Sequence, residues 1–189
     1  MDLFPHHTME KRDKDAKAKA APDRAKKIWL GVCAAAVAAA VAVGVFVYRA
    51  AVAEPGASLP DQGNRHVQTL NEPIPPYNSE PPTSGPHLPY IAPWGIHTEP
   101  LPRQLQVHNL EDGGVMVQYN CPEGCPDLVG KLKAIVSGYE HQVILAPYPG
   151  MKTRIALTAW TKLDAFNDFD EKRIRRFIMA YRGIDHHPR

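Results

Sequence analysis

The sequence predicts an α+β domain that follows a single transmembrane helix and a proline-rich extended segment. Three observations support this. Residues 28–48 are apolar and uncharged, twelve prolines fall within residues 49–102, and β-forming runs alternate with amphipathic helical patterns from Val107 onward. We therefore expect a disordered cytoplasmic tail over 1–27, the anchor over 28–48, an extended segment over 49–102 that wraps the domain, and a domain over 103–189 that has a small, mostly antiparallel sheet and two helices.

The apolar run 28–48 is long enough to cross a membrane. Its 21 residues carry no charge, and a helix rises about 1.5 Å per residue, so the run spans roughly 30 Å of hydrocarbon. Trp29 and Tyr48 stand at its two ends, where aromatic rings prefer the headgroup region. A buried core helix is the alternative, which the length without a charge disfavours. The preceding residues 1–27 are polar and have no apolar face, which predicts disorder.

The charges on either side of the apolar run predict its orientation. Residues 1–27 hold eight Lys or Arg residues, whereas Arg49 is the only one between the run and Arg65. By the positive-inside rule, the N-terminus stays in the cytoplasm and residues 49–189 cross the inner membrane into the periplasm. Ala51-Val52-Ala53 has the form of a signal-peptidase site, but the run exceeds the usual signal-peptide length of about 7–15 residues, so we expect an uncleaved anchor.

The proline-rich segment 49–102 is expected to run extended. Proline lacks a backbone N–H and disfavours helix at the residue before it. Such a segment can be a mere spacer. This one also carries Tyr77, His87, Tyr90, Trp94 and His97, which a solvated spacer would not need. We therefore expect ordered coil around the folded domain.

Five elements are predicted after the proline-rich segment, in the order strand, helix, strand, strand, helix. Pro126 suits the first turn of a helix that Gly138 ends. Asp168 can cap the last helix, with Glu171 as its capping-box partner and Gly183 as its stop. The predicted strands are 115–119, 142–146 and 154–160, the last two joined through the turn at 147–150, and the predicted helices are 126–137 and the segment from Asp168 to Gly183.

Charge and motifs exclude several classes of function. Residues 49–189 hold 15 acidic and 14 basic residues, so no basic surface for nucleic acid is expected. The sequence contains no G-x-S-x-G, H-E-x-x-H, P-loop or G-x-G-x-x-G motif. Ser84 lies three residues before His87, but Thr-Ser-Gly-Pro is interpreted as a turn. His186 and His187, beyond the last helix, are interpreted as solvated. An enzymatic role is therefore not expected.

The histidines of the translocated part indicate a metal site. Three of them stand where the neighbouring residues restrict the backbone, and loops on a rigid sheet edge can gather such rings. Neutral imidazoles supply nitrogen ligands and carboxylates supply oxygen, whereas a thioether favours copper over zinc, so copper is the metal that we expect. A lone histidine is more often a hydrogen-bonded surface residue, and the spacing matches no compact motif. The expected ligands are His66, His87, His108, Glu111 and Met116. Asp112 is expected to orient a ligand without binding the metal itself.

The three cysteines have different expected roles. Cys121 and Cys125 form a C-x3-C pair at a strand-to-helix junction, and outside the cytoplasm a disulfide is the usual fate of such a pair. A thiolate metal site at the helix N-terminus is the second interpretation, and redox catalysis is the third. Cys33 lies within the membrane run and is interpreted as a small residue that faces lipid or another helix.

Two blocks of sequence resemble a known family. They are Pro-Pro-Thr-Ser-Gly-Pro-His at 81–87, followed by Pro-Trp-Gly at 93–95, and Val-His-Asn-Leu-Glu-Asp-Gly-Gly-Val at 107–115, with Tyr119 and the cysteine pair downstream. Together they are similar to a bacterial family of domains of unknown function, the one numbered 3105, over about residues 64–182. The resemblance implies an extracytoplasmic domain behind a single anchor, with no established reaction.

The second block departs from the family pattern, which reads His-Asn-Leu-Glu-His-Gly-Gly. Asp112 replaces the second histidine of that pattern. If this histidine binds metal in relatives, the protein uses an oxygen ligand, another residue or no metal there.

Three functions compete at this point. The first is a non-enzymatic, periplasm-facing domain that is anchored in the lipid bilayer and binds copper through its histidines. The second is an accessory subunit of a larger membrane complex without its own metal, which the single anchor and the missing catalytic motifs favour. The third, a hydrolase or thiol oxidoreductase, depends on Ser84 or the cysteine pair alone.

Overall fold

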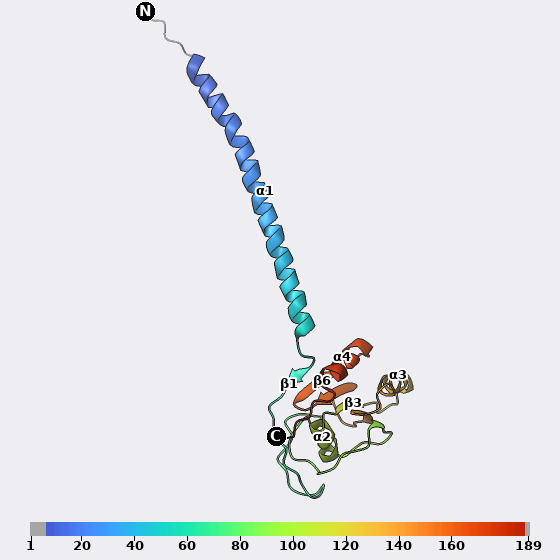
Figure 1. The fold of residues 1–189 in the computed structure, drawn as a ribbon. Coiled ribbons are helices and arrows are strands. Elements are labelled where there is room, and N and C mark those ends of the chain that lie inside the picture. The colour runs from blue at the N-terminus through green and yellow to red at the C-terminus, as the bar shows by residue number, and fades with distance from the viewer. Residues whose placement is uncertain (1–6, 188–189) are drawn as a thin grey trace, which may run out of the picture. The chain divides into compact units, whose positions relative to one another are not determined.

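The computed structural model describes residues 7–187, with side chains described for residues 24–49 and 53–187. The chain divides into two compact units, Met1–Ala53 and Glu54–Arg189. Within the described residues, the first unit is one long helix, and the second contains three helices and a six-stranded sheet (Figure 1).

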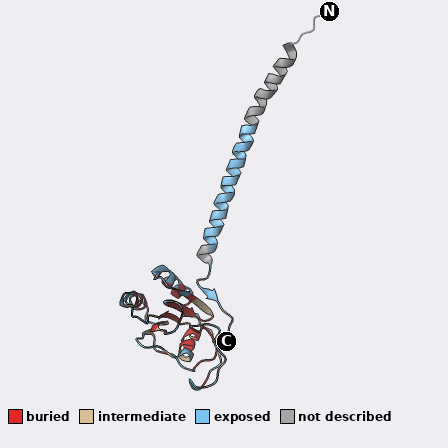
Figure 2. Cartoon of the chain, turned by 180° about the vertical axis from the view of Figure 1, so that it is seen from behind, coloured by how far each residue is buried: buried red, intermediate tan, exposed pale blue. Residues whose placement is uncertain are grey.

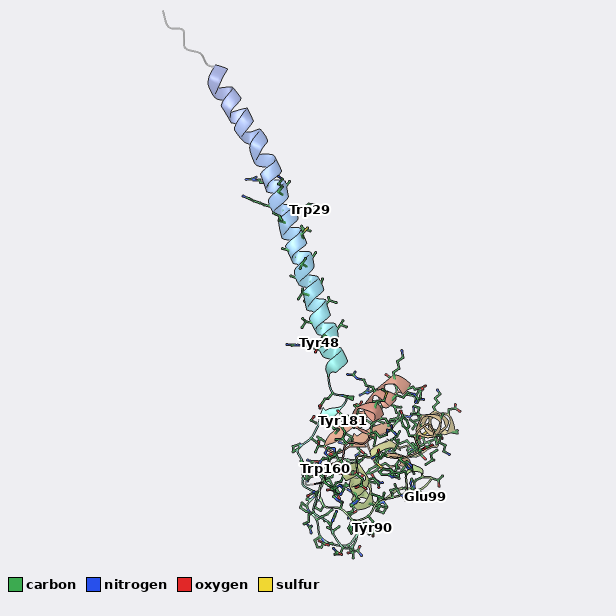
Figure 3. The ribbon with its side chains drawn as sticks, viewed as in Figure 1. Trp29, Tyr48, Tyr90, Glu99, Trp160 and Tyr181 are labelled. Atoms are coloured by element: carbon green, nitrogen blue, oxygen red, sulfur yellow. A yellow bond between two sulfur atoms is a disulfide. The ribbon has the colours of Figure 1, made fainter. Side chains whose placement is uncertain are left out.

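Helix α1 (His7–Val52) contains the predicted membrane segment. Its stretch Arg24–Arg49 has a mean hydropathy of 2.6 and is not buried, so it is long and apolar enough to span a membrane. Figure 2 shows this stretch as exposed, and Figure 3 shows Trp29 and Tyr48 on it. The predicted disordered tail is helical from His7 onward, because its alanine and lysine residues are good helix formers. Residues 1–6 lie outside the described part.

The second unit is an α+β domain, as predicted, and its sheet is mixed. The sheet order is β1-β6-β5-β3-β4-β2. Three pairings are antiparallel (β1 with β6, β6 with β5, β5 with β3) and two are parallel (β3 with β4, β4 with β2). The strands are β1 (Ala57–Ser58), β2 (Gly95–Ile96), β3 (Val115–Tyr119), β4 (Val143–Pro147), β5 (Ile155–Ala159) and β6 (Lys162–Phe166), and the helices are α2 (Arg103–Glu111), α3 (Pro126–Val136) and α4 (Glu171–Tyr181).

The parallel pairing of β3 and β4 explains why the sheet is less antiparallel than expected. Helix α3 connects the two strands, and such a crossover returns the chain in the same direction. Strands β4 and β5, which follow one another in the chain, do not pair, because β3 lies between them. Strand β6 was not predicted: its hairpin with β5 turns at Thr161, which adopts φ 58° without a glycine or asparagine to signal it.

The sheet has an apolar cluster on each face. Val115 and Val117 of β3 point into the larger cluster, which α3 and α4 cover. Met116, between them, points to the opposite face and joins the smaller cluster with Val107 and Leu110 of α2. This alternation is the ordinary period of a strand with both faces covered. Helix α2 is therefore held on the face opposite the other two domain helices.

Helices α2 and α4 both differ from the sequence prediction. Helix α4 begins after Asp170, whose carboxylate accepts a hydrogen bond from the Arg173 backbone N–H at 3.0 Å, so Asp170 rather than Asp168 is the cap. Helix α2 was not predicted. Its buried positions include Gln106, His108 and Asn109, and a polar buried face gives no apolar periodicity to read.

From Glu54 onward, the proline-rich segment belongs to the same compact unit as the domain. It supplies the two-residue edge strands β1 and β2, and residues 81–88 are buried without a break. Gly85 donates its backbone N–H to the Gly63 carbonyl at 2.8 Å, and His87 donates to the Arg65 carbonyl at 3.0 Å. Residues 63–65 and 85–87 of the segment are thus joined to each other by backbone hydrogen bonds.

Candidate metal centre

Helix α2 places His108 and Glu111 three residues apart, on one side of its last turn. The Gly-Gly that follows allows two close approaches. A Cβ at Gly114 would lie 2.4 Å from the Asn109 carbonyl oxygen, and a Cβ at Gly113, where φ is 76°, would lie 2.8 Å from the backbone nitrogen of Ile184. The glycines therefore let the chain turn tightly under α2 and let the C-terminal segment lie against that turn.

The proline-rich segment brings two more histidines to the same place. His66 and His87 form an isolated parallel bridge, in which the Val67 N–H donates to the His87 carbonyl at 2.7 Å. The His87 side chain is fully buried, whereas that of His66 is 42% exposed. The ring centroids of these two residues lie 4.9 Å apart, and those of His66 and His108 lie 5.2 Å apart.

Glu111 lies at the centre of these three rings and is almost completely buried. Its Oε2 atom lies 2.9 Å from His87 Nε2, 3.7 Å from His66 Nε2 and 4.0 Å from His108 Nδ1. One ligand atom from each of the four residues lies within 4.8 Å of all the others. Ligands that are each about 2 Å from one ion are separated by roughly 3–4 Å. The three nitrogens and one oxygen are therefore grouped near the spacing that a metal site requires.

The tautomer of His87 is determined by its neighbour. The Gly85 carbonyl can only accept, so His87 Nδ1 must donate the hydrogen bond of 2.7 Å between them. In the neutral ring, Nε2 then carries a lone pair that faces the Glu111 carboxylate at 2.9 Å. Two acceptors at this distance repel each other unless a proton or a cation lies between them. A ring nitrogen held by a carbonyl behind it is also the usual arrangement of a metal-binding histidine.

His108 offers an acceptor that has no partner. Its Nδ1 is buried and makes no hydrogen bond within the described part of the chain. Burial is the main cause that lowers the pKa of His108 below its usual value, with Asp112 acting in the opposite direction. The ring therefore favours its neutral form, in which a nitrogen can bind metal. An orphaned imidazole nitrogen that faces a carboxylate and two histidines fits a metal ion.

The C-terminal segment also reaches this site. Its two histidines were expected to be solvated; His187 is exposed, whereas His186 is partly buried. The Gly183 N–H donates to the Gly113 carbonyl at 2.8 Å, and the His186 N–H donates to the Glu111 carbonyl at 2.9 Å. The His186 ring stacks on Trp160, with the centroids 5.9 Å apart. His187 Nε2 lies 3.5 Å from Glu111 Oε2 and 3.6 Å from Asp112 Oδ1. The sequence carried no signal for this, because the segment lies far along the chain from α2.

Of the remaining predicted residues, Asp112 lies beside this group and the others lie elsewhere in the domain. Met116 is fully buried in the smaller apolar cluster. Asp112 caps the end of α2, with its Oδ1 3.8 Å from His108 Nε2. Cys121 and Cys125 are joined by a disulfide at the start of α3, with their Cα atoms 5.8 Å apart. Ser84 is buried and accepts a hydrogen bond from the Gln62 N–H at 3.0 Å, as suits a turn residue.

Comparison with known proteins gives one match. A family model described as "Protein of unknown function (DUF3105)" matches residues 66–189, which include all four converging side chains. No curated protein matches the chain. No solved structure matches it either.

Proposed function

The chain belongs to the DUF3105 family, and we propose that its C-terminal domain binds a transition-metal ion through His66, His87, His108 and Glu111. The proposal rests mainly on the contact between His87 Nε2 and the Glu111 carboxylate. The other ring nitrogen, Nδ1, already donates its hydrogen bond to the Gly85 carbonyl, so Nε2 of the neutral ring can only accept. A cation between the two acceptors would remove their repulsion, and the orphaned His108 nitrogen would complete its coordination.

The donor set supports a borderline divalent ion. Imidazole nitrogen suits zinc, copper, iron and nickel, and the affinity of such a site among divalent ions is greatest for Cu²⁺. Copper therefore remains the metal that we propose, as Cu²⁺. The sequence-based argument for copper depended on a thioether ligand, and Met116 packs instead among Val107 and Leu110. Zn²⁺ is the closest competitor.

We propose reversible binding rather than catalysis. The ligands His87 and Glu111 are buried, while 42% of the His66 side chain is exposed, so an ion would enter and leave on the His66 side. The one nucleophile that the sequence offered near these histidines, Ser84, is buried and already hydrogen bonded. An accessible ligand beside two buried ones suits a protein that takes up an ion and passes it on.

We also propose that the domain faces the periplasm. Eight basic residues precede the apolar stretch of α1, and positive charges of this kind stay on the cytoplasmic side. The bonded pair Cys121–Cys125 supports an oxidising compartment for the domain.

Metal titration tests the proposed function. Full-length protein in detergent is stripped of metal and titrated with Cu²⁺ and Zn²⁺ against a chromogenic competitor. We expect His108→Ala to remove most of the affinity, and Glu111→Gln to weaken it strongly, because the amide carries no charge. His141, an exposed histidine, provides the matched control His141→Ala. Equal, weak binding by all four proteins would refute the site and favour an accessory subunit of a membrane complex.

A further inference from the structure

The two ring nitrogens of His108 face two different groups of ligands. Nδ1 lies 4.0 Å from Glu111 Oε2, within the group already described, and Nε2 lies 3.8 Å from Asp112 Oδ1. Both distances are too long for a hydrogen bond. The side chain is nine-tenths buried, with 10% of its surface exposed. Each ring nitrogen of His108 therefore lies near a carboxylate without forming a hydrogen bond to it. This leaves room for a cation beside each nitrogen.

His187 repeats, on the second side, the arrangement that His87 has on the first. Asp185 Oδ1 lies 2.7 Å from His187 Nδ1 and also accepts the His187 backbone N–H at 2.9 Å. Because the carboxylate engages Nδ1–H, the other nitrogen of the neutral ring carries the lone pair, and this nitrogen lies 3.6 Å from Asp112 Oδ1 and 3.5 Å from Glu111 Oε2. A carboxylate behind a histidine orients the ring and increases its basicity as a metal ligand.

We propose that a second divalent metal ion binds between His108 Nε2, Asp112 and His187, so that His108 bridges two ions. One ligand atom from each of these three residues lies within 4.8 Å of the others. The inference rests on the proposed function, because the bridge requires the first ion. When the second ion binds, the remaining ring proton of His108 leaves to solvent, and no oxidant or reductant is involved. Glu111, Asp112 and the deprotonated ring then balance most of the charge of the two cations.

The C-terminal segment is held by backbone hydrogen bonds that place His187 beside Asp112. Its backbone is tied to α2 and the following turn by the bonds from Gly183 to Gly113 and from His186 to Glu111. The ring of His186 stacks on Trp160 at an interplanar angle of 21° and belongs to neither of the two groups of ligand atoms found among the described residues. The side chain of His187 is 41% exposed, which leaves a route for the ion from solvent.

Copper loading with electron paramagnetic resonance tests the inference. Full-length protein in detergent is saturated with Cu²⁺, and bound copper is counted per chain. We expect two copper ions in the wild type and a largely silent resonance signal, because two Cu²⁺ ions joined by one imidazolate couple their spins. His187→Ala should bind one copper and give the full signal of an isolated ion. The control is His186→Phe, which keeps the stacked ring, removes the neighbouring imidazole and should behave as the wild type does.

Two other results would distinguish a failure of the second metal site from a failure of the first. One copper in both the wild type and His187→Ala, with equal affinity and full signals, would overturn the second site and leave the first intact. Binding of no copper by the wild type would refute the first site as well, and the bridge with it. Because His187 is partly exposed near the end of the chain, circular dichroism is expected to show the same fold in each variant.

Discussion

Asn109 and Ala92 are joined by a pair of hydrogen bonds that hold α2 against the proline-rich segment. The Ala92 N–H donates to Asn109 Oδ1, and Asn109 Nδ2 donates to the Ala92 carbonyl, each at 2.9 Å. Both residues are fully buried. His108 and Glu111 flank Asn109 on the helix, whereas His87 lies on the segment that the bonds secure. This contact therefore helps to fix the distance between the two halves of the metal site, together with the bond from the Leu88 N–H to the Gln104 carbonyl of α2 at 3.1 Å.

Replacing Asn109 should weaken both the fold and the site. Asn109→Ala leaves the Ala92 N–H and carbonyl buried without partners, at a cost of about 2–4 kcal/mol in unfolding free energy. We expect metal affinity to fall together with stability. Asn120 is the matched control, because its amide donates to the Met151 carbonyl at 2.7 Å elsewhere. Asn120→Ala should destabilise the domain and leave the affinity of the folded protein unchanged in the same titration, and an equal loss of affinity in both variants would contradict a positioning role.

The stability of the metal-free protein should depend on pH through the site histidines. The folded-state pKa of His108 is lowered from 6.5 mainly by burial, which His87 and His66 reinforce and which Asp112 and Glu111 oppose. Burial also lowers the pKa of His186. The unfolded chain then binds more protons below pH 6.5, so both residues reduce stability as the solution becomes acidic.

His187 acts with the opposite sign. Its hydrogen bond to Asp185 raises its pKa, so its contribution is present in acid and is lost as pH rises through the raised value. Urea unfolding above and below pH 6.5 should show a smaller acid-induced loss of stability in His108→Asn and a larger one in His187→Asn. Identical pH dependence in the wild type and both variants would show that these pKa shifts do not contribute to stability.

Much of the fold and the first ligand set follows from local patterns in the sequence. Helix α3 begins at Pro126 and strand β3 follows the Gly-Gly, as expected. His66, His87, His108 and Glu111 were selected from their sequence contexts, and the structure brings their side chains together. Local restriction of the backbone by glycine and proline is visible in a sequence, and this explains why these positions could be chosen.

The features that could not be predicted depend on tertiary contacts. Helix α2 buries Gln106 and Asn109, whose partners are Gln118 on β3 and the backbone of Ala92, so its buried face is polar. The approach of His187 to Asp112 depends on how the last residues dock on Gly113, which no periodicity reports. Met116 was chosen as a ligand by residue type, yet the alternation of β3 directs it into an apolar cluster.

An ion pair between β6 and α4 should contribute to stability more than a neighbouring pair on the surface. Arg173 binds Asp164 through two hydrogen bonds, 2.9 Å and 2.5 Å long, and lies over the Phe166 ring. Asp164 is 7% exposed, so Arg173→Ala leaves a mostly buried carboxylate unpaired. Since Arg173 itself is 43% exposed, solvent screening reduces the expected cost to about 1–2 kcal/mol.

Arg175 provides the control for this prediction. Its pair with Glu171 joins two exposed side chains one helical turn apart, 2.8 Å from Nε to Oε1. Arg175→Ala should change the unfolding free energy much less than Arg173→Ala does, because solvent screens the exposed pair. Urea unfolding of the two variants side by side measures the difference, and equal effects would contradict the importance of burial at Asp164.

The proposed orientation predicts which part of the chain a protease can reach. Protease added to intact spheroplasts should degrade the unit Glu54–Arg189 and spare an N-terminal tag, because the positive charges before α1's apolar stretch keep that end inside. Lysed cells are the control, in which both ends should be cleaved. A domain protected in intact spheroplasts and cleaved after lysis would reverse the orientation.

X-ray absorption at the zinc edge tests the metal site most directly. Full-length protein is loaded with less than one equivalent of Zn²⁺, so that the tighter position fills first. We predict a first shell of nitrogen and oxygen at about 2.0–2.1 Å, with the outer-shell scattering of three imidazoles, and the loss of one imidazole in His108→Ala. A shell without imidazole scattering, or the same spectrum from both proteins, would contradict a site built from His66, His87, His108 and Glu111.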